Sequence, residues 1–260
     1  MNLGLSGRAA LVTGGSDGIG KATAHRLAVE GASVGITARR SDHLRSAARE
    51  IAASTGREVL ALPGDVTEPD QIKSAVDEAA AAFGRLDILV SNAGKSAAGH
   101  VDAVSDGVWR EDLDLKLMGA VLGARAAAAH MRRQGGGRII NITTPAGKAP
   151  RGGSVPTSVS RAAGIALTKA MSLDYAADRI TVNTVCIGLI KSAQHERWWR
   201  DSGRQLTLDE WYEELGSGVP LGRVGEATEA ADLIAFLASD RAAYITGTAV
   251  NIDGGMSPVV

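Results

Sequence analysis

Residues 13–20 read Thr13-Gly14-Gly15-Ser16-Asp17-Gly18-Ile19-Gly20, and this stretch decides the fold of the chain. An apolar segment, 8–13, precedes the glycines, and an amphipathic segment, 18–30, follows them. Glycines permit a tight turn that approaches a phosphate closely, and the helix behind them offers free N–H groups and a positive dipole end to an anion. The pattern predicts a strand–loop–helix unit that binds a dinucleotide, with an ordinary glycine-rich turn as the alternative.

Short apolar runs alternate with amphipathic segments along the rest of the chain. The expected strands are 8–13, 33–38, 59–63, 86–91, 138–142, 180–186 and 249–253. The expected helices are 18–30, 42–55, 69–83, 105–133, 157–177 and 226–238. This alternation indicates a parallel sheet covered on both faces, a doubly wound, Rossmann-like α/β fold with ligands at the carboxyl ends of its strands. We expect a single domain over 1–260.

Composition excludes several classes of function. The 260 residues carry a net charge of −1, so we expect no nucleic-acid partner and no anionic membrane surface. No apolar segment approaches the ~20 residues that span a bilayer, and no secretory signal is expected. The single cysteine, Cys186, rules out an internal disulfide, fits a buried thiol and favours a reducing, cytoplasmic location. No metal site is expected.

The G-x-x-x-G-x-G spacing of Gly14, Gly18 and Gly20 resembles that of the short-chain dehydrogenases/reductases. Further family-like motifs follow in order over nearly the whole chain: Asp65-Val66, Asn92-Ala93-Gly94, Gly188-Leu189-Ile190-Lys191-Ser192 and Asp253-Gly254-Gly255. Ile187 stands where the family has Pro, and Ser192 where it has Thr. The cofactor contacts that the resemblance implies are Gly14, Ser16, Asp17, Gly18, Ile19, Gly20, Asp65, Val66, Asn92, Ala93, Gly94, Arg161, Gly188, Ile190 and Ser192.

The segment Thr37-Ala38-Arg39-Arg40 bears on the choice between NADP and NAD. An acidic residue at position 38 would hydrogen-bond the adenosine ribose and favour NAD, which Ala38 cannot do. Arg39 could pair with a 2′-phosphate through its planar guanidinium. We therefore expect NADP, although a solvated loop is the alternative for the two arginines. Asp17 argues for NAD, because family members that use NADP often have a basic residue there.

The resemblance places four unusual residues at the reaction centre. The family's catalytic Ser, Tyr, Lys and Asn positions fall on Thr144, Thr157, Arg161 and Lys116. A tyrosine phenol has an unperturbed pKa of about 10, whereas that of an aliphatic hydroxyl is far higher, so Thr157 is a poor acid near neutral pH. Arg161 could still bind the nicotinamide ribose but does not relay protons. A shift of register does not restore the pair, since Tyr175 and Arg179 fall at a helix end and a strand start.

Lys116 is the replacement that could carry a proton. If its helix follows the family, the side chain points toward the cleft, and partial desolvation lowers a lysine pKa into a useful range. Our hypothesis is that Lys116 supplies the acid that Thr157 cannot. The alternative is a lysine that extends to solvent.

The segment 192–218 resembles the helical lid that covers the substrate in this family. It holds Trp198, Trp199, Trp211 and Tyr212, which could bury a ring or acyl chain, together with His195, Arg197 and Arg200, which could meet an acid or a phosphate. Alternatively, these residues pack the lid onto its own domain or a neighbouring subunit. The Ala-rich helices 105–133 and 157–177 resemble those that pair in the family's tetramers, so we expect a homotetramer.

Three functions remain open at this point. The first is an NADP-dependent oxidoreductase acting on a small carbonyl or alcohol with an altered proton-transfer apparatus. The second is a pseudoenzyme, a dinucleotide-binding subunit that supports an active partner or senses redox state. The third is a non-redox lyase or hydrolase that reuses the cleft.

Overall fold

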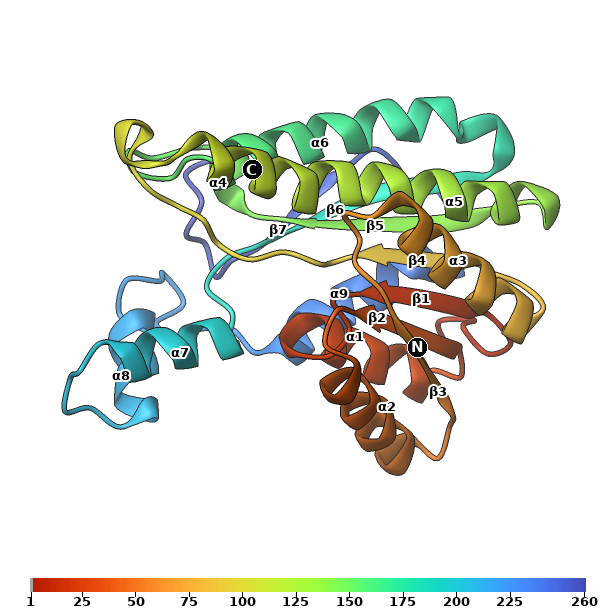
Figure 1. Cartoon of the computed structure of the whole chain (residues 1–260), viewed down its shortest axis with the longest axis horizontal. Helices are drawn as coiled ribbons and strands as arrows, with labels where there is room; N and C mark the ends of the chain where they lie inside the picture. Colours follow the sequence, from red (N-terminus) through yellow and green to blue (C-terminus); the bar gives the residue numbers. More distant parts are fainter. Residues whose placement is uncertain (1) are drawn as a thin grey trace.

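Seven strands pair in parallel in the order β3-β2-β1-β4-β5-β6-β7 in the computed structural model, which describes residues 2–260 (Figure 1). The strands are β1 (Ala9–Thr13), β2 (Ser33–Ala38), β3 (Val59–Pro63), β4 (Ile88–Ser91), β5 (Gly137–Thr143), β6 (Ile180–Ile187) and β7 (Ala249–Ile252). Their order reverses between β1 and β4, and a crevice for ligands forms at such a point in doubly wound sheets. The expected fold class is confirmed.

Helices cover both faces of the sheet, as the buried strands require. They are α1 (Gly18–Val29), α2 (Ser41–Thr55), α3 (Pro69–Phe83), α4 (Asp106–Leu113), α5 (Gly119–Arg133), α6 (Thr157–Asp174), α7 (Ala193–Asp201), α8 (Leu208–Gly216) and α9 (Ala227–Ala238). Side chains from α1, α2 and α9 form one apolar core, and those from α3 and α5 contribute to a second on the opposite face (Figure 1). No helix in the described part of the chain has both the length and the apolar content for a bilayer crossing.

The expected helix over 105–133 is interrupted. It divides into α4 and α5, and one wider π-helical turn, Asp114–Met118, lies between them. A π turn inserts one residue into a helix and often lies at a functional site. A hydrophobic pattern read at 3.6 residues per turn does not reveal that insertion, so the sequence predicted one continuous helix.

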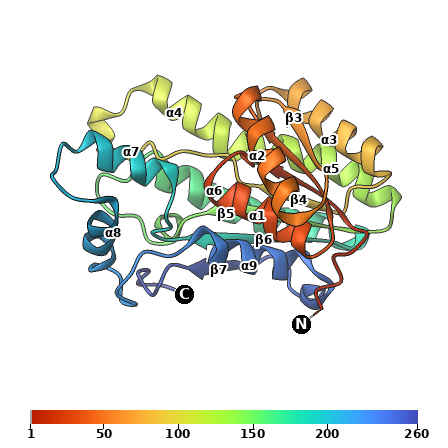
Figure 2. The same ribbon diagram turned by 90° about the horizontal axis from the view of Figure 1, so that it is seen from below.

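The expected lid segment, 192–218, contains α7 and α8, which project away from the sheet (Figure 2). Each helix has a polar N-cap: the Ser192 hydroxyl accepts from the His195 N–H, and Thr207 forms a reciprocal capping box with Glu210. These caps satisfy N–H groups that a short helix leaves free at its start. In α8 an apolar stripe supports these caps, because Leu208, Trp211, Tyr212 and Leu215 follow the i, i+3, i+4, i+7 spacing of one helix face.

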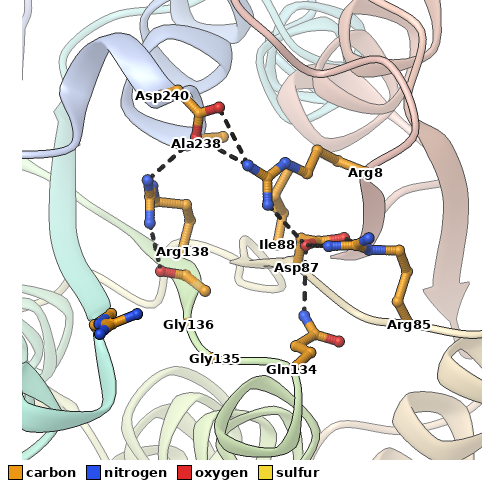
Figure 3. A pocket seen from close by; sticks show the side chains of 12 residues that line it. Arg8, Arg85, Asp87, Ile88, Gln134, Gly135, Gly136, Arg138, Ala238 and Asp240 are labelled. Carbon is orange, nitrogen blue, oxygen red and sulfur yellow. Dashed lines mark hydrogen bonds and ion pairs between the residues drawn. The ribbon is translucent and has the colours of Figure 1, made fainter.

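A cavity of about 220 Å³ lies at the amino ends of the strands, opposite the glycine loop, and is lined by four arginines (Figure 3). Arg8 and Arg85 converge there on the Asp87 carboxylate, whose side chain is only 4% exposed. Arg8 and Arg138 also pair with the more exposed Asp240. These ion pairs tie the starts of β1, β4 and β5 together. Asp87 thus joins segments far apart in the sequence.

Candidate functional site

The glycine loop is held against the turn after β4. The Asn92 amide donates to the carbonyl oxygens of Thr13 at 3.0 Å and Gly14 at 3.2 Å. In return, the Thr13 hydroxyl accepts from the backbone N–H groups of Asn92 and Ala93 at 3.0 and 3.1 Å. Asn92 therefore fixes the loop at the strand-order reversal, where a ligand crevice is expected.

Glycine is required in this loop for geometric reasons. Gly14 and Gly18 have φ angles of +63° and +48°, in the left-handed region that side chains disfavour. A Cβ atom at Gly20 would lie 2.2 Å from the Gly14 carbonyl oxygen and 2.5 Å from the Asn92 amide nitrogen. The loop can bring its backbone close to a phosphate only without these side chains. Ser16 in the loop and Ile19 in the first turn of α1 are both buried.

Asp17 caps the helix that follows the loop. Its carboxylate accepts from the Gly18 N–H at 2.9 Å and lies 3.8 Å from His43 Nε2. The side chain thus supports the start of α1. Its assignment as a direct cofactor contact remains a prediction.

The residues expected around the adenosine lie together at the carboxyl ends of β2 and β3. Arg39 Nη1 is 3.8 Å from the Asp65 carboxylate, and the Arg39 side chain is 65% exposed. Asp65 is itself held by the backbone N–H and hydroxyl of Thr67, at 3.0 and 2.9 Å. Val66 beside it is buried. The Arg39 guanidinium is loosely paired and accessible to an anion.

Thr157 is the first residue of α6, and two donors point at its hydroxyl. The Ala97 N–H lies 3.0 Å and Lys116 Nζ lies 2.9 Å from Thr157 Oγ1. Lys116 comes from the π turn between α4 and α5. The structure therefore brings together Lys116 and Thr157, the residues to which the resemblance assigns the family's Asn and Tyr positions.

The Lys116 side chain is 1% exposed, which excludes the solvent-extended alternative. It pairs with the equally buried Asp112 carboxylate one helical turn earlier. Burial and the positive charge of Arg161 lower the pKa of Lys116 to about 8, although Asp112 acts in the opposite direction. An amine with such a pKa can exchange a proton near neutral pH, which an ordinary lysine does poorly.

Arg161 lies one turn after Thr157, beneath the turn that follows β4. Its Nη1 donates to the Ile142 carbonyl oxygen at 2.6 Å, and its Nη2 would lie 2.7 Å from a Cβ at Gly94. Burial lowers the pKa of Arg161 to about 10, so the group stays cationic at neutral pH. Its Nε has no partner in the described part of the chain. Arg161 thus supplies a buried positive charge, and its Nε–H is a hydrogen-bond donor that the described residues leave unused.

Thr144 follows β5 and also has an unused polar atom. Its hydroxyl oxygen is buried and has no hydrogen-bond partner among residues 2–260. Buried polar groups are normally paired, and an exception calls for a partner from outside the chain, such as a ligand or water. Thr144 is therefore suited to bind a substrate oxygen.

The lid meets the rest of the site through its first residues. The Gln194 side chain accepts from the Ser96 N–H at 3.0 Å, Ile190 is buried, and a Cβ at Gly18 would lie 3.9 Å from Ser192 Cβ. Gly188 packs against Asp253, where a Cβ would approach to 2.6 Å. These contacts place the start of the lid beside the glycine loop.

Aromatic side chains of the lid contact one another and the lid backbone. The buried His195 ring packs against Trp198 and Tyr212, with centroids 5.2 and 6.4 Å apart, and Trp199 Nε1 donates to the Leu206 carbonyl within the lid. Burial lowers the pKa of His195, so the ring is neutral at pH 7 and does not attract an acid. Trp198 is 46% exposed.

Sequence reasoning missed two members of the reaction centre, Asp112 and Ser160. The Ser160 hydroxyl donates to the Asp112 carboxylate at 2.6 Å. An Asp–Lys pair four residues apart was visible in the sequence, since such residues lie on one helix face. At this spacing an ion pair usually lies on an exposed helix face, so the sequence alone does not mark this one as buried.

Known proteins are similar to this chain in both sequence and fold. The family model described as Enoyl-(Acyl carrier protein) reductase matches residues 14–257. A ketoacyl reductase of the granaticin polyketide synthase of Streptomyces violaceoruber is 36% identical over 251 residues, 95% of this chain and 92% of that protein. The 3-oxoacyl-acyl-carrier-protein reductase FabG of Staphylococcus aureus is 34% identical, covering 96% and 98% of the two chains. The structure of L-sorbose reductase from Gluconobacter frateurii, complexed with NADPH and L-sorbose, aligns with a TM-score of 0.95 and 32% identity over 100% of both chains.

Proposed function

The chain belongs to the short-chain dehydrogenase/reductase family, and from this premise we propose that it is an NADP-dependent reductase of a small carbonyl compound in which Lys116 supplies the proton through Thr157. The observation that carries the proposal is the 2.9 Å contact between Lys116 Nζ and Thr157 Oγ1 at the carboxyl edge of the sheet. Relatives that reduce ketoacyl groups and a sugar support an oxidoreductase. They disfavour a lyase or hydrolase.

The residues present fit NADP. The loop around Gly14 and Gly20 has no room for side chains and offers its backbone, as a pyrophosphate requires. The buried Arg161 cation, whose Nε has no partner among residues 2–260, supports the role at the nicotinamide ribose that the resemblance implies for it. The accessible Arg39 guanidinium can hold the 2′-phosphate, and the NADPH complex of L-sorbose reductase supports this choice of cofactor.

Two hydroxyls and one ammonium carry out the proton chemistry. Bound NADPH supplies the hydride that the carbonyl carbon accepts. Thr144 and Thr157 hold the carbonyl oxygen, and Thr157 passes its proton to that oxygen while it takes one from Lys116 Nζ. Lys116 is left as a neutral amine and recovers a proton before the next turnover, and Arg161 keeps its charge throughout.

The Arg39→Ala variant tests the cofactor assignment. We expect the Kd for NADPH to rise about 10- to 100-fold, because a charge-assisted pair to a phosphate contributes about 1.5–3 kcal/mol. The Kd for NADH should change little, since NADH lacks the 2′-phosphate. Calorimetric titration measures both, and an equal loss for the two cofactors would contradict the assignment.

A pseudoenzyme is the second candidate, favoured by the high pKa of an aliphatic hydroxyl at position 157. The Thr157→Tyr/Arg161→Lys double variant separates the two. If Lys116 already supplies the proton, restoring the usual pair raises carbonyl reduction by less than about tenfold. A gain of about 10²-fold or more, the usual contribution of general acid catalysis, would support the pseudoenzyme.

The assembly that we propose is a homotetramer. Met118, Val159 and Leu173 are large apolar side chains left 40%, 44% and 65% exposed on the π turn and on α6. A partner subunit would cover such a surface, and the family resemblance points to the same helices. A monomeric mass in light scattering would contradict this assembly.

A further inference from the structure

Two charged side chains are fully buried together beside the reaction centre. Asp112 lies in α4 and Lys116 lies in the π turn that follows, and each side chain is 1% exposed. Charges removed from water are costly unless they pair closely and fill their remaining hydrogen-bonding capacity. Solubility and packing alone therefore do not explain why this ion pair is buried.

The Asp112 carboxylate spans two helices. One oxygen contacts Lys116 Nζ, and the other accepts from the Ser160 hydroxyl at 2.6 Å. Ser160 is 1% exposed and lies on α6, close to Thr157, whose carbonyl oxygen its hydroxyl also approaches at 3.1 Å. Both oxygens of the carboxylate are thereby occupied, and the carboxylate links Lys116 to α6.

Other charges around Lys116 act against its protonation. Arg161 on α6 and Lys95 in the segment after β4 are both positive and disfavour a third cation. Lys95 is itself paired with the exposed Glu111 at 2.6 Å. Asp112 is the acidic group that contacts Lys116 directly, and it opposes the effect of burial and of these cations.

We propose that Asp112, held by Ser160, is a positioning residue that keeps Lys116 protonated and its ammonium directed at the Thr157 hydroxyl. The inference rests on the proposed function, in which Lys116 is the proton source. Asp112 exchanges no proton with the substrate and touches neither substrate nor cofactor. Its effect passes through Lys116 alone.

A side chain that contributes only packing would make a different prediction. Its loss would lower the amount of folded protein without changing the proton affinity of Lys116 in the molecules that fold, whereas loss of a contacting carboxylate also lowers the Lys116 pKa. The proposal requires that the ionisation of Lys116 itself moves. The readout is therefore the titration of the Lys116 side chain.

The experiment is an NMR titration of the full-length protein labelled with ¹³C at the lysine Cε atoms, with the Lys116 signal assigned by its absence in the Lys116→Met variant. In the Asp112→Asn variant the Lys116 midpoint should fall by about 1 pH unit or more, because a contacting opposite charge typically contributes about 1–3 units. The Ser160→Ala variant should lower it less, in the same direction. An unchanged midpoint in the folded variants would overturn the proposal.

Glu111→Gln is the matched control, because it removes a neighbouring carboxylate that pairs with Lys95 and not with Lys116. It should leave the midpoint at its wild-type value, and a fall as large as that in Asp112→Asn would contradict a specific role for Asp112. If the Asp112→Asn variant does not fold, the midpoint in the Ser160→Ala variant decides the question by itself, because that variant retains the Asp112–Lys116 ion pair.

The titration needs no turnover, so the two proposals fail separately. A lowered midpoint in an enzyme that reduces no carbonyl would support the positioning role and refute the proposed proton source. Reduction that depends on Lys116, together with an unmoved midpoint, would support the proton source and refute the role of Asp112.

Discussion

Replacing Lys116 with Met lowers kcat for carbonyl reduction about 10²–10⁴-fold, the range that general acid catalysis typically contributes. The Thr157 hydroxyl would remain in place but would lose the cation that lies 2.9 Å from its oxygen. NADPH affinity should change little, because Lys116 is buried behind Thr157 and not in the glycine loop. Steady-state kinetics with saturating NADPH measures the loss.

The pH profile provides the signature of this proton source. Since burial and Arg161 bring the pKa of Lys116 to about 8, reduction by the wild-type enzyme should decline as the pH rises through about 8. The reverse reaction, alcohol oxidation, needs the neutral amine and should rise over the same range. In the Lys116→Met variant both trends should disappear. Retained turnover with an unchanged profile would remove Lys116 from the mechanism.

Two controls keep this result interpretable. Lys116→Met leaves the Asp112 carboxylate buried without its partner, which can cost several kcal/mol of stability. The Asp112→Leu/Lys116→Met double variant removes both charges and should be equally inactive but more stable. Lys95→Met removes an exposed lysine nearby and should retain activity close to that of the wild type.

Replacing Asp87 with Ala lowers the free energy of unfolding by about 1.5–3 kcal/mol, the range typical of hydrogen bonds to a charged group, because Asp87 is buried while its partners Arg8 and Arg85 are 36% and 41% exposed. The change removes the acceptor of Arg85 and Arg8 (Figure 3). It also removes the acceptor of the Ala9 N–H and leaves that group in the interior, since Ala9 is buried. Urea denaturation at fixed protein concentration measures the difference. A loss below about 1 kcal/mol would contradict this role for Asp87.

Asp240→Asn is the matched control, because Asp240 accepts from the same Arg8 but its side chain is 54% exposed. An exposed ion pair contributes about 0–1 kcal/mol, so the change should be small. Burial raises the pKa of Asp87, but hydrogen bonds from Arg85, Ala9 and Arg8 outweigh it and hold the pKa low. Its stabilisation is therefore complete above the unfolded-state value of about 3.9 and is lost as the pH falls below it.

The sequence was sufficient to predict the fold because its signals are local. The glycines of 13–20 lie between a strand and a helix, and helix 69–83 was predicted with the bounds that α3 has. The lid was less predictable, since α7 and α8 are only 9 residues long each and begin at caps on Ser192 and Thr207, although α8 carries an apolar stripe from Leu208 to Leu215. Such short helices carry little periodic signal.

The candidate site was predictable only where a family motif marked it. The assignment of Thr144, Thr157 and Arg161 followed from the spacing of the family's motif, but the hydrogen bonds that these residues form did not. The contacts of Asp112 follow only from the three-dimensional structure, where the π turn directs Lys116 into the interior and α6 brings Ser160 to the other carboxylate oxygen. These contacts join segments about 45 residues apart, and no local pattern encodes them.

A crystal structure of the NADP⁺ complex tests the central claim most directly, because it shows which side chain lies beside the nicotinamide C4 atom. We expect the Thr157 hydroxyl there, with Lys116 Nζ hydrogen-bonded behind it and Arg161 near the ribose. A phenolic oxygen from any tyrosine of this chain in that position, or a Lys116 side chain directed away from Thr157, would contradict the account.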